Sequence, residues 1–92
     1  MAKKVVLITG CSSGIGRSLA LTYNSHDFTV WATARNVSSL DGLHGDIRKL
    51  AVDVTDDESC KKAVETILKE EGRIDVLVAN AGQGLLVALK SV

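Results

Sequence analysis

Apolar residues gather in short blocks along the chain, with stretches of mixed polarity between them. The first block, Val5 to Ile8, does not alternate with polar residues, which is typical of a parallel sheet covered by helices on both faces. The second block is rich in β-branched and aromatic residues, which favour strands. Strands are therefore predicted for residues 4–9, 28–34, 48–52 and 74–79.

The stretches between these strands predict two helices. The first begins at Ser13 and ends near residues 25–27. Its apolar residues recur at spacings that place them on one face, namely Ile15, Leu19, Ala20 and Tyr23. The second helix has Thr55 as its expected N-cap, with Glu58 completing a capping box, and Gly72 as its expected end. Its apolar face consists of Cys60, Ala63, Val64, Ile67 and Leu68.

The order of these elements predicts the fold class. Residues 36–46 are polar and are expected to form a loop or a short, poorly formed helix. Right-handed crossovers place the strands in the order 3-2-1-4, which is the first half of a Rossmann-like, doubly wound parallel sheet of the α/β class. The last predicted strand, Ile74 to Ala79, is apolar on both faces. Without a further strand beside it, this open edge is expected to favour self-association.

The composition narrows the classes of partner. The chain has 92 residues, enough for one small domain, and its formal net charge is zero with scattered lysines and arginines. A nucleic acid is therefore not an expected partner. No apolar run approaches the length of a membrane span and no signal peptide is recognisable, so a cytoplasmic protein is expected. Cys11 and Cys60 are interpreted as free thiols, and neither His26 nor His44 has a partner at metal-ligand spacing.

A glycine-rich turn follows the first predicted strand. It reads Thr-Gly-Cys-Ser-Ser-Gly-Ile-Gly over residues 9–16 and opens into the first helix. A strand, a turn of this kind and a helix N-terminus together favour the binding of a phosphate. Gly10 allows the sharp turn, Gly14 allows a pyrophosphate to approach the backbone, and Gly16 allows close packing on the sheet. The alternative is a tight turn without a ligand, because the spacing is neither that of the usual dinucleotide motif nor that of a P-loop.

Side chains that follow the other strands indicate which nucleotide is bound. Arg35 ends the second strand with no acidic residue on either side of it, which favours the 2′-phosphate of NADP over the free ribose hydroxyl of NAD. The alternative is a solvated loop charge. Asp53 ends the third strand and is expected to accept from the adenine amino group, unless it only forms an Asx turn into the next helix. Asn80, after the fourth strand, is expected to hold the edge of the sheet close to the cofactor.

Together these residues resemble the short-chain dehydrogenase/reductase family over essentially the whole chain. The glycine turn matches its cofactor motif, Asp53-Val54 its adenine-contacting pair, and residues 79–82 its Asn-Asn-Ala-Gly motif, with Ala79 in place of the first Asn. The resemblance implies an NADP(H) site and a partial NADP-binding domain over residues 1–92. The residues expected at that site are Gly10, Ser12, Ser13, Gly14, Ile15, Gly16, Arg35, Asp53, Val54, Asn80, Ala81 and Gly82.

Within the family, the chain resembles fungal acyl-dihydroxyacetone-phosphate reductases and steroid or retinol dehydrogenases. This implies NADPH-dependent reduction of a ketone, such as one on a lipid, and a full-length form that associates with membranes or lipid droplets is also compatible with it. The family's catalytic Ser and Tyr-x-x-x-Lys have no counterpart here, since Tyr23 is followed four residues later by Asp27. The chain is therefore expected to be an inactive N-terminal cofactor half of a longer reductase. The alternative is a non-catalytic nucleotide-binding module or remnant.

Overall fold

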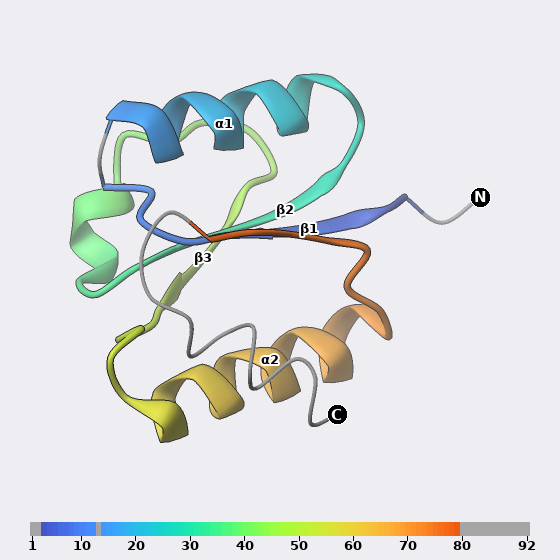
Figure 1. Ribbon diagram of the computed structural model, residues 1–92. Coiled ribbons are helices and arrows are strands. Elements are labelled where there is room, and N and C mark those ends of the chain that lie inside the picture. Colours follow the sequence, from blue (N-terminus) through green and yellow to red (C-terminus); the bar gives the residue numbers. More distant parts are fainter. Residues whose placement is uncertain (1–2, 13, 80–92) are drawn as a thin grey trace.

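A four-stranded parallel sheet forms the centre of the computed structural model, which describes residues 3–12 and 14–79 (Figure 1). Its strands are β1 (Val5–Ile8), β2 (Thr29–Ala34), β3 (Arg48–Ala51) and β4 (Val76–Val78). They lie in the order β3-β2-β1-β4, all parallel, with α1 (Gly14–Ser25) on one face and α2 (Asp57–Glu71) on the other. The predicted fold class and strand order are confirmed.

The register of the sheet brings the carboxyl ends of three strands to one edge. Ile8, the last residue of β1, pairs with Ala32, and Ala34 at the end of β2 pairs with Ala51 at the end of β3. The hydrogen bonding continues past β3, where the Val52 N–H donates to the Ala34 carbonyl at 2.9 Å. The segments that follow β1, β2 and β3 therefore leave the sheet on the same side.

Helix α1 differs from the predicted apolar stripe in its first turn. The Ile15 residue is 72% exposed, whereas Gly16 and Ala20 are buried. Residues four positions apart share a helix face, so Gly16 and Ala20 define the side that faces the sheet, and Ile15 is rotated from it by about 100°. The placement of Ile15 in the buried stripe is therefore wrong. Leu19 and Tyr23 lie at the margin of the buried side and are partly exposed.

Helix α2 begins one residue later than the sequence predicts. Its N-cap is Asp56, whose carboxylate accepts from the Glu58 N–H at 3.0 Å. The prediction of Thr55 as N-cap is wrong, because the Thr55 hydroxyl donates to Asp53 and a carboxylate takes the free helix N–H group instead. The predicted end is confirmed, since Gly72 adopts a left-handed φ of 79°. In the part of the chain that is described, neither helix combines the length and apolar composition needed to cross a membrane.

The polar stretch between β2 and β3 contains a short 3-10 helix, η1 (Val37–Leu40), as the prediction of a loop or poorly formed helix allows. Asn36 caps it, because its side-chain oxygen accepts from the Ser38 N–H at 3.1 Å and from the Ser38 hydroxyl at 2.8 Å. Three buried apolar residues anchor this segment to the core on the α1 side of the sheet, namely Leu40, Leu43 and Ile47. The Asn36 cap and these buried residues therefore hold the segment between β2 and β3 in a defined conformation.

The sheet separates two clusters of buried apolar side chains. The cluster under α2 contains Val5, Leu7, Trp31, Val52, Cys60, Ala63, Val64 and Ile67. The cluster under α1 contains Val6, Ile8, Cys11, Ala20, Val30, Ala32, Ala34, Leu40, Leu43 and Ile47. Residues 5–8 thus alternate between two covered faces, which explains why this block is apolar at every position. Both cysteines are buried and free, as predicted.

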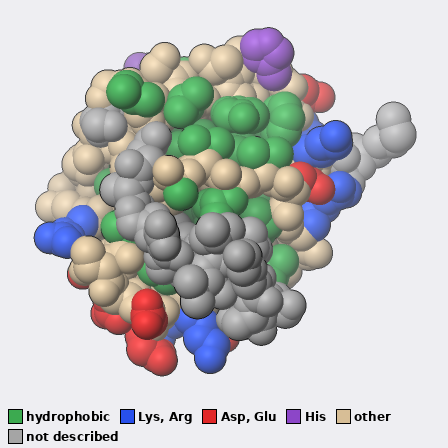
Figure 2. All heavy atoms as spheres, viewed as in Figure 1, with side chains coloured by type: hydrophobic (Ala, Val, Ile, Leu, Met, Phe, Trp, Pro, Cys, Tyr) green, Lys and Arg blue, Asp and Glu red, His purple; other side chains and the backbone are tan. Residues whose placement is uncertain are grey.

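Strand β4 is shorter than the predicted strand over residues 74–79, and it forms one edge of the sheet within the described residues. Val76 and Val78 pack on the α1 side and Leu77 packs on the α2 side, all three only partly buried. Figure 2 shows hydrophobic side chains gathered on the surface between α1 and the sheet. The apolar character of both faces is confirmed, and self-association through this edge stays a prediction.

Candidate functional site

A cavity of about 90 Å³ lies where the carboxyl ends of β1, β2 and β3 meet. The turn between β1 and α1, the end of β2 and the segment after β3 all contribute to it. Its lining consists of Gly10, Ser12, Thr33, Ala34, Arg35, Val52 and Val54. Four residues predicted from the sequence, namely Gly10, Ser12, Arg35 and Val54, are thus brought together in one cavity.

The turn after β1 is fixed to the strands on both sides of it. The Thr9 N–H donates to the Val78 carbonyl and the Cys11 N–H donates to the Thr33 carbonyl, each at 3.0 Å. The Cys11 thiol donates to the Ile8 carbonyl at 3.3 Å. Burial raises the pKa of Cys11, so this side chain stays a protonated thiol that packs and anchors the turn.

The glycines of the turn differ in what surrounds them. Gly10 has a φ of 68°, which a residue with a side chain rarely adopts, so it permits the sharp exit from β1. A Cβ on Gly16 would overlap the Gly10 carbonyl oxygen, so Gly16 allows the first turn of α1 to pack on the loop. A Cβ on Gly14 would meet nothing within 4 Å. The backbone at Gly14 is therefore open to the approach of a ligand.

The N-terminus of α1 has the properties of an anion site. The helix has 12 residues and no acidic residue in its first turn. Ser12, Gly14 and Ile15 are exposed at this end. The dipole of a helix favours a negatively charged ligand at such a terminus. A phosphate therefore fits the space in front of α1, next to the cavity.

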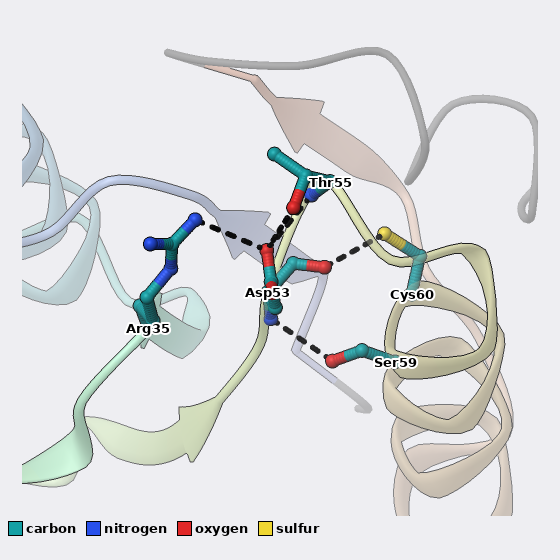
Figure 3. Close-up of polar contacts among 5 residues, drawn as sticks. All are labelled: Arg35, Asp53, Thr55, Ser59 and Cys60. Carbon is teal, nitrogen blue, oxygen red and sulfur yellow. Dashed lines mark hydrogen bonds and ion pairs between the residues drawn. The ribbon is translucent and has the colours of Figure 1, made fainter.

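Arg35, which lines this cavity, lies beside Asp53 (Figure 3). One guanidinium nitrogen of Arg35, Nη2, is 3.4 Å from Asp53 Oδ1. Their side chains are 75% and 39% exposed, so the pair lies at the surface. No acidic residue stands next to Arg35 along the chain, but the structure places Asp53 beside it in space.

Asp53 also forms the Asx turn that was the alternative to its role at the adenine. Its Oδ1 accepts from the Thr55 hydroxyl at 2.6 Å and from the Thr55 N–H at 3.0 Å. Its own N–H donates to the Ser59 hydroxyl at 2.9 Å, and its carbonyl accepts from the Cys60 thiol at 3.7 Å (Figure 3). The hydroxyl of Thr55 first, then its N–H, hold the pKa of Asp53 below its ordinary value, and Arg35 adds to this. The carboxylate is therefore charged and fixed in position.

Two polar residues that fix the elements around the site, Thr33 and Arg17, were not predicted from the sequence. Thr33 is buried in β2, lines the cavity and donates its hydroxyl to the Ile8 carbonyl at 3.0 Å. Arg17 of α1 donates to the Ser39 carbonyl at 3.2 Å, which ties η1 to the helix beside the turn. After Thr29 at the start of β2, Thr33 is the next polar residue in an otherwise apolar strand, which is a usable signal. Nothing in the sequence indicates the contact of Arg17.

Some predicted residues lie outside the described residues, namely Ser13, Asn80, Ala81 and Gly82. Gly14, Ile15, Gly16 and Asp53 do not line the cavity, although Gly16 lies against Gly10 and Asp53 stands between Val52 and Val54 in the chain. Within residues 3–12 and 14–79, no three potential metal-ligating side chains are grouped together. The candidate site is therefore the surface at the strand ends that comprises the cavity, the turn after β1 and the start of α1.

A larger hollow, of about 710 Å³, opens at the opposite end of β2 and β3. Its lining includes Trp31, Arg48 and Glu70 and carries charges of both signs. Trp31 Nε1 and Arg48 Nε both donate to Glu71, at 3.0 and 2.9 Å, so several of its polar groups already have partners. It contains none of the residues predicted for the site. The smaller cavity is therefore the candidate ligand site, because it lies at the carboxyl ends of the strands and is lined by residues predicted to bind the cofactor.

Comparisons with known proteins identify relatives of this chain. Residues 4–91 match the protein family described as short chain dehydrogenase. A 3-ketodihydrosphingosine reductase of Bacteroides thetaiotaomicron is 42% identical over 90 residues, which cover 98% of this chain and 32% of the relative. An NADPH-dependent 1-acyldihydroxyacetone phosphate reductase of Schizosaccharomyces pombe is 43% identical over 84 residues, which cover 88% of this chain and 28% of the relative.

A solved short-chain oxidoreductase structure has a similar fold. The crystal structure of a metagenomic short-chain oxidoreductase in complex with NADP superposes with a TM-score of 0.82 and 31% identity, covering 89% of this chain and 40% of the other. The chain spans about a third of the length of the curated relatives it matches. The predicted resemblance is confirmed by a family match that covers almost the whole sequence. The chain therefore belongs to the short-chain dehydrogenase family of oxidoreductases, which bind a nicotinamide cofactor.

Proposed function

We propose that this chain forms the NADP(H)-binding part of a carbonyl reductase. The observation that carries the proposal is the cavity lined jointly by Gly10, Ser12, Arg35 and Val54. It lies outside the carboxyl ends of parallel strands, where open α/β sheets bind ligands. The cavity combines a cation, a glycine turn and apolar side chains. These suit a phosphorylated ribose, a pyrophosphate and an adenine ring, respectively.

The residues present fit the cofactor. The open backbone at Gly14 and the exposed start of α1 accept a pyrophosphate. Val54 offers an apolar surface to the adenine ring, and Asp53 lies next to it. Arg35 supplies the planar guanidinium that pairs with a 2′-phosphate. The NADP in a related crystal structure and the NADPH named for the yeast relative support the choice of this cofactor.

The cofactor, when bound, supplies a hydride to a carbonyl carbon. The chain's own residues bind and orient its adenosine and pyrophosphate. The sequence contains no Tyr-x-x-x-Lys, so we expect binding of NADPH by the 92 residues without turnover. The relatives that reduce 3-ketodihydrosphingosine and 1-acyldihydroxyacetone phosphate support a ketone on a lipid as the substrate class of a longer form.

A thermal melt of the 92-residue chain tests the proposal. A ligand that binds only the folded state at a hundredfold excess over its Kd stabilises it by about 2.7 kcal/mol. NADPH is expected to raise the melting temperature more than NADH at equal concentration. Arg35→Gln is expected to remove most of the NADPH advantage, whereas Lys49→Gln, an exposed cation of β3 outside this cavity, leaves it unchanged.

Different results contradict different parts of the proposal. The absence of a shift with either nucleotide contradicts cofactor binding by this chain. Equal shifts with NADPH and NADH contradict the preference for NADP and the role of Arg35. Oxidation of NADPH by the pure chain in the presence of a lipid ketone contradicts the expected lack of turnover.

A further inference from the structure

The end of β2 and the end of β3 bring opposite charges together at the cofactor cavity. Ala34 and Ala51 pair at the ends of these strands, so the next residues along each strand leave the sheet side by side. Arg35 Nη2 and Asp53 Oδ1 are 3.4 Å apart as a result, although the two residues are 18 positions apart in the chain. Arg35 also lines the cavity, so the residue that carries the positive charge belongs to the cavity and contacts the carboxylate.

Asp53 is the fixed partner of this pair. Two hydrogen bonds from Thr55 hold its Oδ1, and the Ser59 hydroxyl accepts from its N–H. The bonds from Thr55 also keep the carboxylate charged by lowering its pKa. Arg35 is held more loosely, since its side chain is 75% exposed. The exposed guanidinium therefore has room to turn toward a second anion besides Asp53.

We propose that Asp53 determines how strongly the site discriminates between adenine nucleotides with and without a 2′-phosphate. Its carboxylate competes with the 2′-phosphate for Arg35, so the preference for NADP is weaker than Arg35 alone produces. This inference rests on the proposed function. The effect is expected to be selective for the 2′-phosphate, because this is the group that the proposed function assigns to Arg35.

The size of the effect follows from the exposure of the pair. Exposed ion pairs change an equilibrium constant by up to about fivefold, and salt screens them. Removal of the charge of Asp53 is therefore expected to raise the preference for a 2′-phosphate by about twofold to fivefold at low ionic strength. The increase should shrink at high ionic strength. It should be absent without Arg35, because the carboxylate acts largely through the guanidinium.

Two ligands that differ only in the 2′-phosphate provide the measurement. We define the phosphate preference as the Kd of 5′-AMP divided by the Kd of 2′,5′-ADP, each measured by calorimetry on the 92-residue chain. Asp53→Asn retains an Oδ1 acceptor for Thr55 and removes the charge. Asp56→Asn is the matched control, because it removes a carboxylate from the neighbouring turn and retains an N-cap acceptor. Asp53→Ser is a second uncharged variant in case Asp53→Asn does not fold.

The expected result is a higher phosphate preference in Asp53→Asn, no change in Asp56→Asn, and no further effect of Asp53→Asn in an Arg35→Gln background. An unchanged or lower preference in Asp53→Asn overturns the inference, because Asp53 then orients Arg35 or is irrelevant to it. Wild-type chain that binds neither nucleotide overturns the proposed function and the inference together. Binding of both nucleotides with no response to Asp53 overturns the inference alone.

Discussion

Gly16 faces the carbonyl group of Gly10 so closely that a methyl group on Gly16 would overlap the oxygen. The neighbour is backbone, which cannot rotate away as a side chain can. This contact holds the first turn of α1 against the loop that follows β1. The site and the fold therefore depend on the same pair of glycines.

Gly16→Ala is expected to destabilise the fold by about 1–3 kcal/mol, because the added methyl group forces the helix and the loop apart. Gly14→Ala is the matched variant, since a Cβ there meets nothing within 4 Å. It is expected to retain or slightly raise the free energy of unfolding and to weaken nucleotide binding. Urea unfolding followed by the fluorescence of the single tryptophan measures both variants. Equal stabilities for the two would contradict the close contact.

Asp75 is expected to make the fold sensitive to acid. Its Oδ2 accepts from the Val5 N–H at 2.7 Å, and its Oδ1 accepts from Arg73 Nε at 3.0 Å and from Nη2 at 2.6 Å. The hydrogen bonds from Arg73 first, then that from Val5, lower the pKa of Asp75 in the folded state. The resulting stability is complete above the ordinary Asp pKa of about 3.9 and is lost as the pH falls through the lowered value.

The test is the free energy of unfolding of the wild type and of Asp75→Asn across this acidic range. The variant is expected to be less stable than the wild type near neutral pH and to show a smaller loss on acidification. Asp46→Asn, in the exposed loop before β3, serves as the control and should follow the wild type. The pKa of Asp53 is lowered too, so some acid sensitivity remains in Asp75→Asn. Parallel curves for Asp75→Asn and wild type would refute the role of Asp75.

Glu71 joins α2 to the sheet through two donors. Its Oε2 accepts from Trp31 Nε1 at 3.0 Å and from Arg48 Nε at 2.9 Å. Glu71→Ala leaves the indole N–H of a buried residue without this acceptor, which costs about 1–3 kcal/mol. It should also shift the tryptophan emission of the folded state. Glu70→Ala, the exposed neighbour, should do neither, and an equal loss of stability in the two variants would count against the bridge.

Asp56→Ala is expected to lower the free energy of unfolding by about 1 kcal/mol, because it removes the N-cap of α2. Asp57→Ala removes the same charge from the same helix end without removing the capping acceptor. The difference between the two variants isolates the cap from the helix dipole. Helix content by circular dichroism and urea midpoints give the comparison. A larger effect of Asp57→Ala would show that the charge matters more than the cap.

The strand order was predictable because apolar blocks and their crossovers leave few arrangements. The start of α2 was harder, since Thr55 and Asp56 are both good caps and only the competing bond from Thr55 to Asp53 decides between them. Ile15 fits the helical period, but the contact of Gly16 with Gly10 selects which side of α1 is buried. The periodicity alone contains no information on that contact.

Several residues that line the site were predictable from the sequence, but the ion pair between Arg35 and Asp53 was not. Gly10, Ser12, Arg35 and Val54 each follow a strand, so their convergence in one cavity follows from the parallel order. The neighbour of Arg35 depends on the register of β2 and β3, which two short strands with little alternation do not specify. Asp53 is consequently close to Arg35 in space while nothing along the chain links them.

The pairing of β1 has a consequence for the order in which the protein is made. β1 lies between β2 and β4, and its bonds to Asp75 and β4 join residues 70 positions apart. Closing a loop of that length costs more entropy than closing the short loops between neighbouring strands, and such contacts form slowly. On the ribosome, the side of β1 that pairs with β4 therefore has no partner among the described strands until residues 76–78 have been synthesised.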